Sequence, residues 1–183
     1  LLGEALAELE QGFGAVVTAT GMAAVTLVLQ LLEPQDLVFA PHNCYGGTYR
    51  LLSQLKLQQV VNTEFHNQIE GNYIEKILSR RPKLVWIETP SNPLLRITDI
   101  AAIAEAAHSV GSIVVVDNTF LSPALQQPLN LGADIVIHST TKYINGHSDV
   151  VGGAVIAKTQ ELFERLKYWA NCLGLTASPF DAY

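Results

Sequence analysis

The stretch Ser139-Thr140-Thr141-Lys142-Tyr143 directly follows the apolar run Ala-Asp-Ile-Val-Ile-His at residues 133–138, and the rest of the chain is organised around it. Because β-branched residues favour buried strands, we predict a strand over 133–138. A lysine directly after a buried strand lies where its charge is hard to solvate, so its amine is more easily made nucleophilic. Lys142 is therefore a candidate for forming a Schiff base.

A second apolar strand, predicted over residues 113–117, ends in the carboxylate of Asp117. An acid in that place can pair with a protonated pyridine nitrogen, which pyridoxal 5'-phosphate needs in order to act as an electron sink. The hydroxyls of Ser139 and Thr141, two residues apart, can project the same way and hydrogen-bond a phosphate. The lysine, the acid and the hydroxyls together indicate pyridoxal phosphate as the cofactor.

The composition limits the class of protein. The chain has 183 residues, 49% of them hydrophobic, which suits one α/β domain with a sizeable core and argues against disorder. No run approaches the roughly 20 apolar residues of a membrane span. The net charge of −6, without a basic cluster, argues against nucleic acid or an anionic membrane as the main partner.

The cysteines and histidines indicate neither disulfides nor a metal. Cys44 and Cys172 lie far apart without a CxxC pair, so we expect no disulfide framework and no zinc finger. The five histidines have no metal-ligand spacing, and no metal is proposed. A reducing cytoplasm is the expected location.

Predicted strands alternate with predicted helices along the whole chain. Besides the two strands above, strands are expected at 15–18, 37–40, 58–65, 83–88 and 152–157, and helices at 1–10, 21–29, 68–79, 100–110 and 160–171. Mostly continuous apolar strands in this alternation predict an α/β fold of three α/β/α layers with a mostly parallel sheet. Ligands of such sheets gather at the carboxyl ends of the strands.

The helix that begins at Gly21 is a candidate anion site. Thr20 is predicted to be its N-cap, and the backbone N–H groups of Gly21 and Met22 would face a phosphate with the help of the helix dipole. A glycine in that position allows a close approach. A simple capped turn without a ligand is the alternative.

Three further residues are candidates for ligand contacts. Tyr45, followed by two glycines, can stack on a flat cofactor, or it can be a core tyrosine. Asn92, in a loop stiffened by two prolines, can present its amide to a ligand, or it can form an Asx turn. Arg50 can pair with a substrate carboxylate, or it can form a surface salt bridge.

Four motifs carry a resemblance to a known family. They are Ala40-Pro41-His42-Asn43-Cys44-Tyr45-Gly46-Gly47, Pro90-Ser91-Asn92-Pro93-Leu94-Leu95-Arg96, Val116-Asp117-Asn118-Thr119-Phe120, and residues 138–147, His-Ser-Thr-Thr-Lys-Tyr-Ile-Asn-Gly-His. The chain resembles the fold-type I pyridoxal-phosphate enzymes of cysteine and methionine metabolism, and among them most of all the bacterial cystathionine γ-synthases. The resemblance implies that residues 1–183 are the cofactor-binding large domain, with the family's amino-terminal segment and carboxy-terminal domain missing.

The resemblance also implies a role for each candidate residue. It implies Lys142 as the Schiff-base lysine and proton shuttle, Asp117 as the partner of the pyridine nitrogen, and Tyr45 as a catalytic residue stacked on the ring. It implies that the phosphate is bound by Gly21, Met22, Ser139 and Thr141. Asn92 would lie near the cofactor's phenolic oxygen or the substrate carboxylate, and Arg50 would help to bind the substrate's distal carboxylate.

The implied reaction is a γ-replacement on an O-acylhomoserine, in which O-succinylhomoserine and L-cysteine give cystathionine during methionine biosynthesis. A cystathionine or methionine β- or γ-lyase and an O-acylhomoserine sulfhydrylase are alternatives within the family. A catalytically incomplete binding or assembly module is an alternative of another class. Members of the family usually form homotetramers, built from dimers that share active sites, and act on small amino-acid substrates.

Overall fold

The computed structural model describes all 183 residues, which divide into two compact units. The first unit comprises Leu1–Leu31, Asn118–Asn130 and Asp134–Tyr183. The second comprises Leu32–Asp117 and Leu131–Ala133. The expectation of one domain over residues 1–183 stays a prediction.

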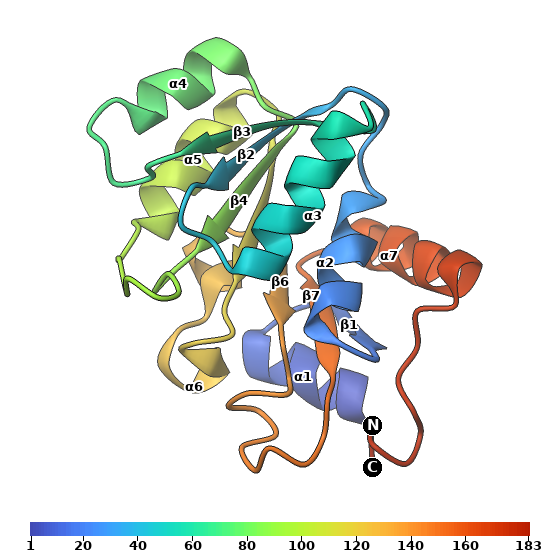
Figure 1. The fold of residues 1–183 in the computed structure, drawn as a ribbon. Helices are drawn as coiled ribbons and strands as arrows, with labels where there is room; N and C mark the ends of the chain where they lie inside the picture. The colour runs from blue at the N-terminus through green and yellow to red at the C-terminus, as the bar shows by residue number, and fades with distance from the viewer. The chain divides into compact units, whose positions relative to one another are not determined.

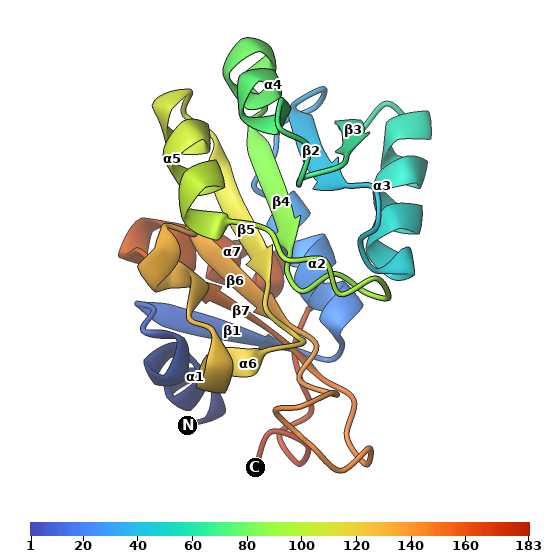
Figure 2. The ribbon, with the colours of Figure 1, turned by 90° about the vertical axis from the view of Figure 1, so that its left-hand side faces the viewer.

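The first unit contains three strands between two layers of helices. Its elements are α1 (Leu2–Glu10), β1 (Gly14–Thr18), α2 (Gly21–Leu29), α6 (Ser122–Leu125), β6 (Ile135–His138), β7 (Gly153–Ala157) and α7 (Gln160–Leu173), with all but the last residue of a 3₁₀ helix at Pro128–Leu131. Strand β7 lies between β1 and β6 and is antiparallel to both. Helices α1 and α6 cover one face of these strands, and α2 and α7 cover the other (Figures 1 and 2).

The second unit is a parallel sheet with helices on both faces. Its elements are β2 (Leu37–Pro41), α3 (Gly46–Leu57), β3 (Asn62–His66), α4 (Tyr73–Arg80), β4 (Leu84–Glu88), α5 (Ile100–Ser109) and β5 (Ile113–Asp117). The strands run in the order β5-β4-β2-β3, and every pair is parallel. Helix α3 lies on one face and α4 and α5 on the other (Figure 2). The predicted three-layer α/β architecture with mostly parallel strands is confirmed.

Local signals explain where most elements begin and end. Helix α2 has the predicted bounds, and the Thr20 hydroxyl caps it by accepting a hydrogen bond from the Ala23 N–H at 2.9 Å. Strands β4, β6 and β7 are buried along their whole length, as their apolar sequences predict. The longest helix, α7, has 14 residues, and no helix is long and apolar enough to cross a membrane.

Two predicted boundaries are wrong in the second unit. The strand expected over 58–65 begins only at Asn62, because Gln58 still ends α3 and Gln59 has a left-handed backbone. The helix expected over 68–79 begins at Tyr73, because Gln68 lies outside it in the preceding turn and its side chain is used in other hydrogen bonds. The Gln68 side chain is buried and donates to the Trp86 carbonyl at 2.6 Å and to the Tyr73 hydroxyl at 3.1 Å.

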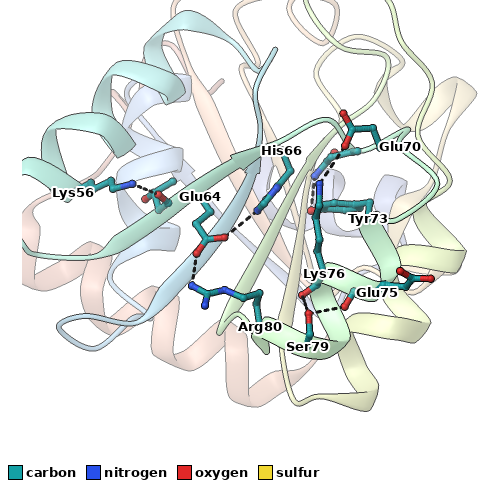
Figure 3. A network of polar contacts seen from close by, with 11 residues as sticks. Lys56, Glu64, His66, Glu70, Tyr73, Glu75, Lys76, Ser79 and Arg80 are labelled. Atoms are coloured by element: carbon teal, nitrogen blue, oxygen red, sulfur yellow. Dashed lines mark hydrogen bonds and ion pairs between the residues drawn. The ribbon is translucent and has the colours of Figure 1, made fainter.

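A polar network surrounds the edge strand β3 (Figure 3). The Glu64 carboxylate pairs with Arg80 of α4 and lies 3.3 Å from the His66 ring, while Lys56 of α3 donates to the Thr63 carbonyl at 2.8 Å. Burial lowers the pKa of His66, although the neighbouring Glu64 charge opposes that shift. The network therefore connects α3 and α4 to the edge strand, and the charge of Glu64 is paired with that of Arg80.

Gly153 provides a test of the packing in the first unit. A Cβ atom added there would lie 2.2 Å from the Thr20 carbonyl oxygen, whereas one added at Gly71 would meet nothing within 4 Å. We expect Gly153→Ala to lower the free energy of unfolding by about 1–3 kcal/mol, because β7 and the turn before α2 would have to move apart. Denaturant unfolding of the full-length protein checks this. Gly71→Ala is the control, and equal stabilities of the two variants would contradict the packing described.

Candidate functional site

In the first unit, the beginning of α2 lies against the residue that follows β6. A Cβ atom added to Gly21 would be 2.8 Å from the Ser139 Cβ and 3.0 Å from its Oγ. Only glycine therefore fits at the first position of α2 without displacing Ser139. The side-chain hydroxyl of Ser139 is thereby placed beside the amino-terminal end of the helix.

This arrangement offers several donors to an anion. The Thr20 hydroxyl accepts a hydrogen bond from the Ala23 N–H. The N–H groups of Gly21 and Met22 belong to the first turn and have no acceptor within the helix. The helix dipole adds a partial positive charge at the same end. Together with the Ser139 hydroxyl, these groups form a donor set suited to a phosphate. The structure thus brings Gly21 and Ser139 together, and the phosphate contacts of Gly21, Met22 and Ser139 stay a prediction.

The Thr141 hydroxyl has a structural partner. It accepts a hydrogen bond from the Gly152 N–H at 3.0 Å and donates one to the Gly152 carbonyl at 3.2 Å. Both Ser139 and Thr141 lie beyond the last residue of β6, so the alternation of a strand does not set their directions. Thr141 ties the turn after β6 to the residue before β7, and its contact with a phosphate stays a prediction.

Lys142 lines a pocket in the first unit, but it is exposed. The pocket has a volume of about 510 Å³ and is lined by Phe120, Thr141, Lys142, Tyr143, Gly146, Ser148, Asp149, Val150 and Val151. The expectation of a lysine in a poorly solvated place directly after a buried strand is wrong for this structure. Strand β6 ends at His138, and the chain then turns, with the Lys142 N–H donating to the Ser139 carbonyl at 3.2 Å.

In the second unit, two carboxylates end neighbouring parallel strands. Glu88 is the last residue of β4 and is paired in register with Asp117, the last residue of β5. Residues paired in this way project from the same face of a sheet, so the two carboxylates are neighbours. Glu88 is buried and Asp117 is half-buried. Asp117 therefore lies at the carboxyl end of its strand, as predicted, with a second acid beside it.

The Glu88 carboxylate holds two loops that carry predicted site residues. One oxygen accepts the Tyr45 N–H at 2.7 Å, and the other accepts the Asn92 N–H at 2.9 Å. The Asn92 loop is fastened further by its neighbour Ser91, whose hydroxyl accepts from the Asn43 amide at 2.7 Å. One buried carboxylate therefore fixes the backbone positions of both Tyr45 and Asn92.

Burial and the neighbouring acids raise the pKa values of Glu88 and Cys44. Burial, and then the negative charge of Asp117, raise the pKa of Glu88 to about 7, against the two N–H groups that favour its charged form. Burial, assisted by the Glu88 charge, raises the pKa of the Cys44 thiol to about 12. A buried thiol with a raised pKa favours its protonated form, which is a poor nucleophile.

Tyr45 and Arg50 both face solvent in the second unit. The Tyr45 side chain is 46% exposed, so the alternative of a core tyrosine is wrong and a flat surface is open to a ligand. Arg50 is exposed on the second turn of α3, where its guanidinium lies near Gly46. The substrate role of Arg50 stays a prediction.

Sequence reasoning missed two buried acids, Glu88 and Glu10. Glu88 ends an apolar strand directly before a loop, as Asp117 does, so the same signal would have found it. Glu10 lies four residues after Leu6 on the apolar face of α1, where a carboxylate is unexpected. It is fully buried and pairs with His138.

A family model described as Cys/Met metabolism PLP-dependent enzyme matches residues 1–183. The chain belongs to this family. The resemblance drawn from the four sequence motifs is thereby confirmed. The description covers pyridoxal-phosphate dependence, which the lysine, acid and hydroxyl pattern had indicated.

Relatives within the family have different names. The cystathionine gamma-synthase of Escherichia coli (strain K12) is 55% identical over 180 residues, which are 98% of this chain and 47% of that protein. The cystathionine gamma-lyase of Bacillus subtilis (strain 168) is 43% identical over 176 residues, 96% of this chain and 46% of that protein. The chain therefore spans about half the length of the curated relatives it matches.

Solved structures of the family have the same fold. The crystal structure of cystathionine gamma synthase from Xanthomonas oryzae pv. oryzae in complex with cystathionine matches with a TM-score of 0.97 and 58% identity, covering 99% of this chain and 47% of that one. Cystathionine gamma-lyase from Lactobacillus plantarum complexed with L-serine matches with a TM-score of 0.95 and 38% identity, covering 99% and 48%. The fold-type I assignment is confirmed.

Glu88 predicts a pH dependence of stability. Its pKa is about 7 in the folded protein against an ordinary value of 4.5, so the folded state binds this proton more tightly than the unfolded state. The contribution of Glu88 to stability therefore falls as the pH rises from about 4.5 to about 7, by up to roughly 3 kcal/mol. Glu88→Gln removes this dependence.

The measurement is denaturant unfolding of the full-length protein and of Glu88→Gln at a series of pH values. We expect the wild type to lose stability relative to the variant across this interval. The exposed Glu161→Gln controls for the loss of one negative charge. Parallel pH curves for wild type and Glu88→Gln would refute the assignment.

Proposed function

We propose that this chain forms the cofactor platform of a pyridoxal-phosphate enzyme. The observation that carries the proposal lies in the first unit, where Ser139 meets Gly21 at the start of α2 and is followed three residues later by a lysine in a pocket. An anion site beside an accessible amine suits a ligand that carries both a phosphate and an aldehyde.

The residues of the phosphate site fit the group. Gly21 lies directly against Ser139, so that a Cβ atom there would clash with the Ser139 side chain, and the first N–H groups of α2 and the Ser139 hydroxyl supply hydrogen-bond donors at this place. We infer that Gly21 and Met22 bind phosphate oxygens through their N–H groups and that Ser139 does so through its hydroxyl. Thr141 would join them by turning its O–H away from the Gly152 carbonyl.

Residues of the second unit suit the cofactor's ring. When bound, pyridoxal phosphate supplies an aldehyde that combines with amines and a ring that takes up electrons from the adjoining carbon. The Asp117 carboxylate would hold a proton on the ring nitrogen. The exposed face of Tyr45 would stack on the ring, and the Asn92 amide would donate to the phenolic oxygen or to the substrate carboxylate.

Lys142 would both hold the cofactor and move protons. Its Nζ is the only amine among the residues that line the pocket. Once the substrate has taken its place on the cofactor, the Lys142 amine would accept a proton from the substrate Cα and return protons to neighbouring carbons. Phe120 and Tyr143, whose rings meet edge to face in the same pocket, would limit the access of water to it.

We propose γ-replacement on O-succinylhomoserine with L-cysteine as the reaction of the full-length protein. In that reaction the Cγ–O bond breaks, succinate leaves with the bonding pair, the cysteine sulfur bonds to Cγ, and the thiol proton is released. The support is the 55% identity to the Escherichia coli protein named cystathionine gamma-synthase. Arg50 is proposed to bind the distal carboxylate of the succinyl substrate.

Elimination is the second candidate reaction. The 43% identity to the Bacillus subtilis protein named cystathionine gamma-lyase favours it, because the same platform residues serve both reactions. Product analysis separates the two. Cystathionine and succinate would form from O-succinylhomoserine and cysteine in the first case, and cystathionine itself would be cleaved in the second. A sulfhydrylase would accept sulfide in place of cysteine.

We also propose that the full-length protein is a cytoplasmic homotetramer that acts on small amino acids. This proposal rests on membership of the family. Sedimentation of the purified full-length protein tests the assembly, with a tetramer as the expected species and a stable monomer as the contrary one.

Lys142→Ala tests the function directly. We expect turnover of O-succinylhomoserine and cysteine to fall by about 10²–10⁴-fold or more, because the variant lacks the group that transfers protons. Cystathionine formation is measured in the full-length protein, with the exposed Lys158→Ala as the control for loss of a lysine. Normal turnover by Lys142→Ala would eliminate the proposed role. A wild type that binds the cofactor but turns over none of these substrates would favour the binding-module alternative.

A further inference from the structure

A buried carboxylate lies behind the phosphate site. Glu10, the last residue of α1, has no solvent exposure. Its Oε1 accepts the Asn118 amide N–H at 2.8 Å and lies 2.5 Å from Nε2 of His138, while its Oε2 has no hydrogen-bond partner. A carboxylate is costly to bury, and an apolar side chain in its place is often at least as stable. Stability alone does not account for an acid here.

The two partners of Glu10 directly precede residues of the site. His138 is followed by Ser139, and Asn118 is followed by Thr119, whose hydroxyl accepts the Ser139 N–H at 2.9 Å. The Asn118 N–H also donates to the Ile137 carbonyl at 3.1 Å. Glu10 therefore joins the two chain segments that meet at Ser139.

Gln126 prevents Asn118 from turning its amide. The Asn118 amide N–H donates to the Gln126 carbonyl at 2.8 Å, and its Oδ1 accepts from the Gln126 side chain at 2.9 Å. With its orientation set in this way, Asn118 can present only its N–H side to Glu10. The contact of Glu10 with Asn118 is thus fixed in orientation, and its contact with His138 joins the second segment.

We propose that Glu10 is a positioning residue for phosphate binding. Through His138 and Asn118 it holds Ser139 at the one distance from Gly21 that the close packing permits. Without Glu10, the two segments are joined here only by the hydrogen bonds from Asn118 to Ile137 and from Ser139 to Thr119, and the Ser139 hydroxyl is held less closely beside the start of α2. This inference rests on the proposed function, because it assigns the ligand held there as a phosphate.

The test compares two ligands that share the aldehyde and the ring. Pyridoxal phosphate and pyridoxal differ only in the phosphate, so the ratio of their dissociation constants measures the phosphate site alone. We expect Glu10→Met, in the full-length protein, to lower the preference for pyridoxal phosphate by about tenfold or more, since small misplacements of a binding group have effects of that order. Dissociation constants come from spectroscopic titration of the apoprotein.

Three further variants complete the test. Glu10→Gln can keep both hydrogen bonds through its single carbonyl oxygen, because Oε1 alone accepts them, and it is expected to retain the preference. His138→Leu cuts the same contact from the other side and is expected to lose it, so the test stands if Glu10→Met does not fold. Leu6→Ala weakens the buried face of the same helix without touching the contact and is expected to lower stability alone.

The outcomes separate the inference from the proposed function. A wild type that binds pyridoxal phosphate no better than pyridoxal would overturn the phosphate site and the inference with it. A wild-type preference that Glu10→Met and His138→Leu leave unchanged would overturn the inference alone. An equal loss in Leu6→Ala would also overturn it, because the effect would then follow from the stability of α1.

Discussion

The first unit depends on the close approach of Gly21 to Ser139. A helix that begins against the end of a strand leaves no room for a side chain at that position. A second glycine permits a similar close contact next to it, since Gly153 of β7 lets the Thr20 carbonyl pack directly on the strand. The first N–H groups of α2 and the Ser139 hydroxyl therefore lie at the same end of the helix, an arrangement that suits the preorganised anion site proposed for this unit.

In both units a buried acid holds neighbouring segments in place through hydrogen bonds. Glu88 accepts two backbone N–H groups from the loops of Tyr45 and Asn92, and Glu10 accepts from Asn118 and His138. In each case the acid lies outside the set of residues expected to touch the cofactor, yet it fixes residues that belong to that set or adjoin it. Loops held by these hydrogen bonds keep their geometry better than loops held by apolar contacts alone, because hydrogen bonds are directional.

The sequence predicted the elements better than the contacts between them. The apolar runs, the Thr20 cap and the acid at the end of β5 are local signals, and the structure agrees with them. Burial of Lys142 was expected wrongly, because the length of the turn after β6 cannot be read from the composition of the strand. Glu10 and His138 are 128 residues apart, so nothing local announces their pairing. The pair of hydrogen bonds between Thr141 and Gly152 was not predicted for the same reason, because it joins the turn after β6 to the residue before β7.

Lys142 is central to the proposed function, as the residue to which pyridoxal phosphate would become attached. The most direct measurement is the visible absorption spectrum of the full-length protein with pyridoxal phosphate, before and after borohydride reduction, followed by peptide mapping. We expect a yellow band that reduction abolishes, with the cofactor then fixed to the peptide that contains Lys142. Attachment to a different lysine, or no band at all, would contradict it.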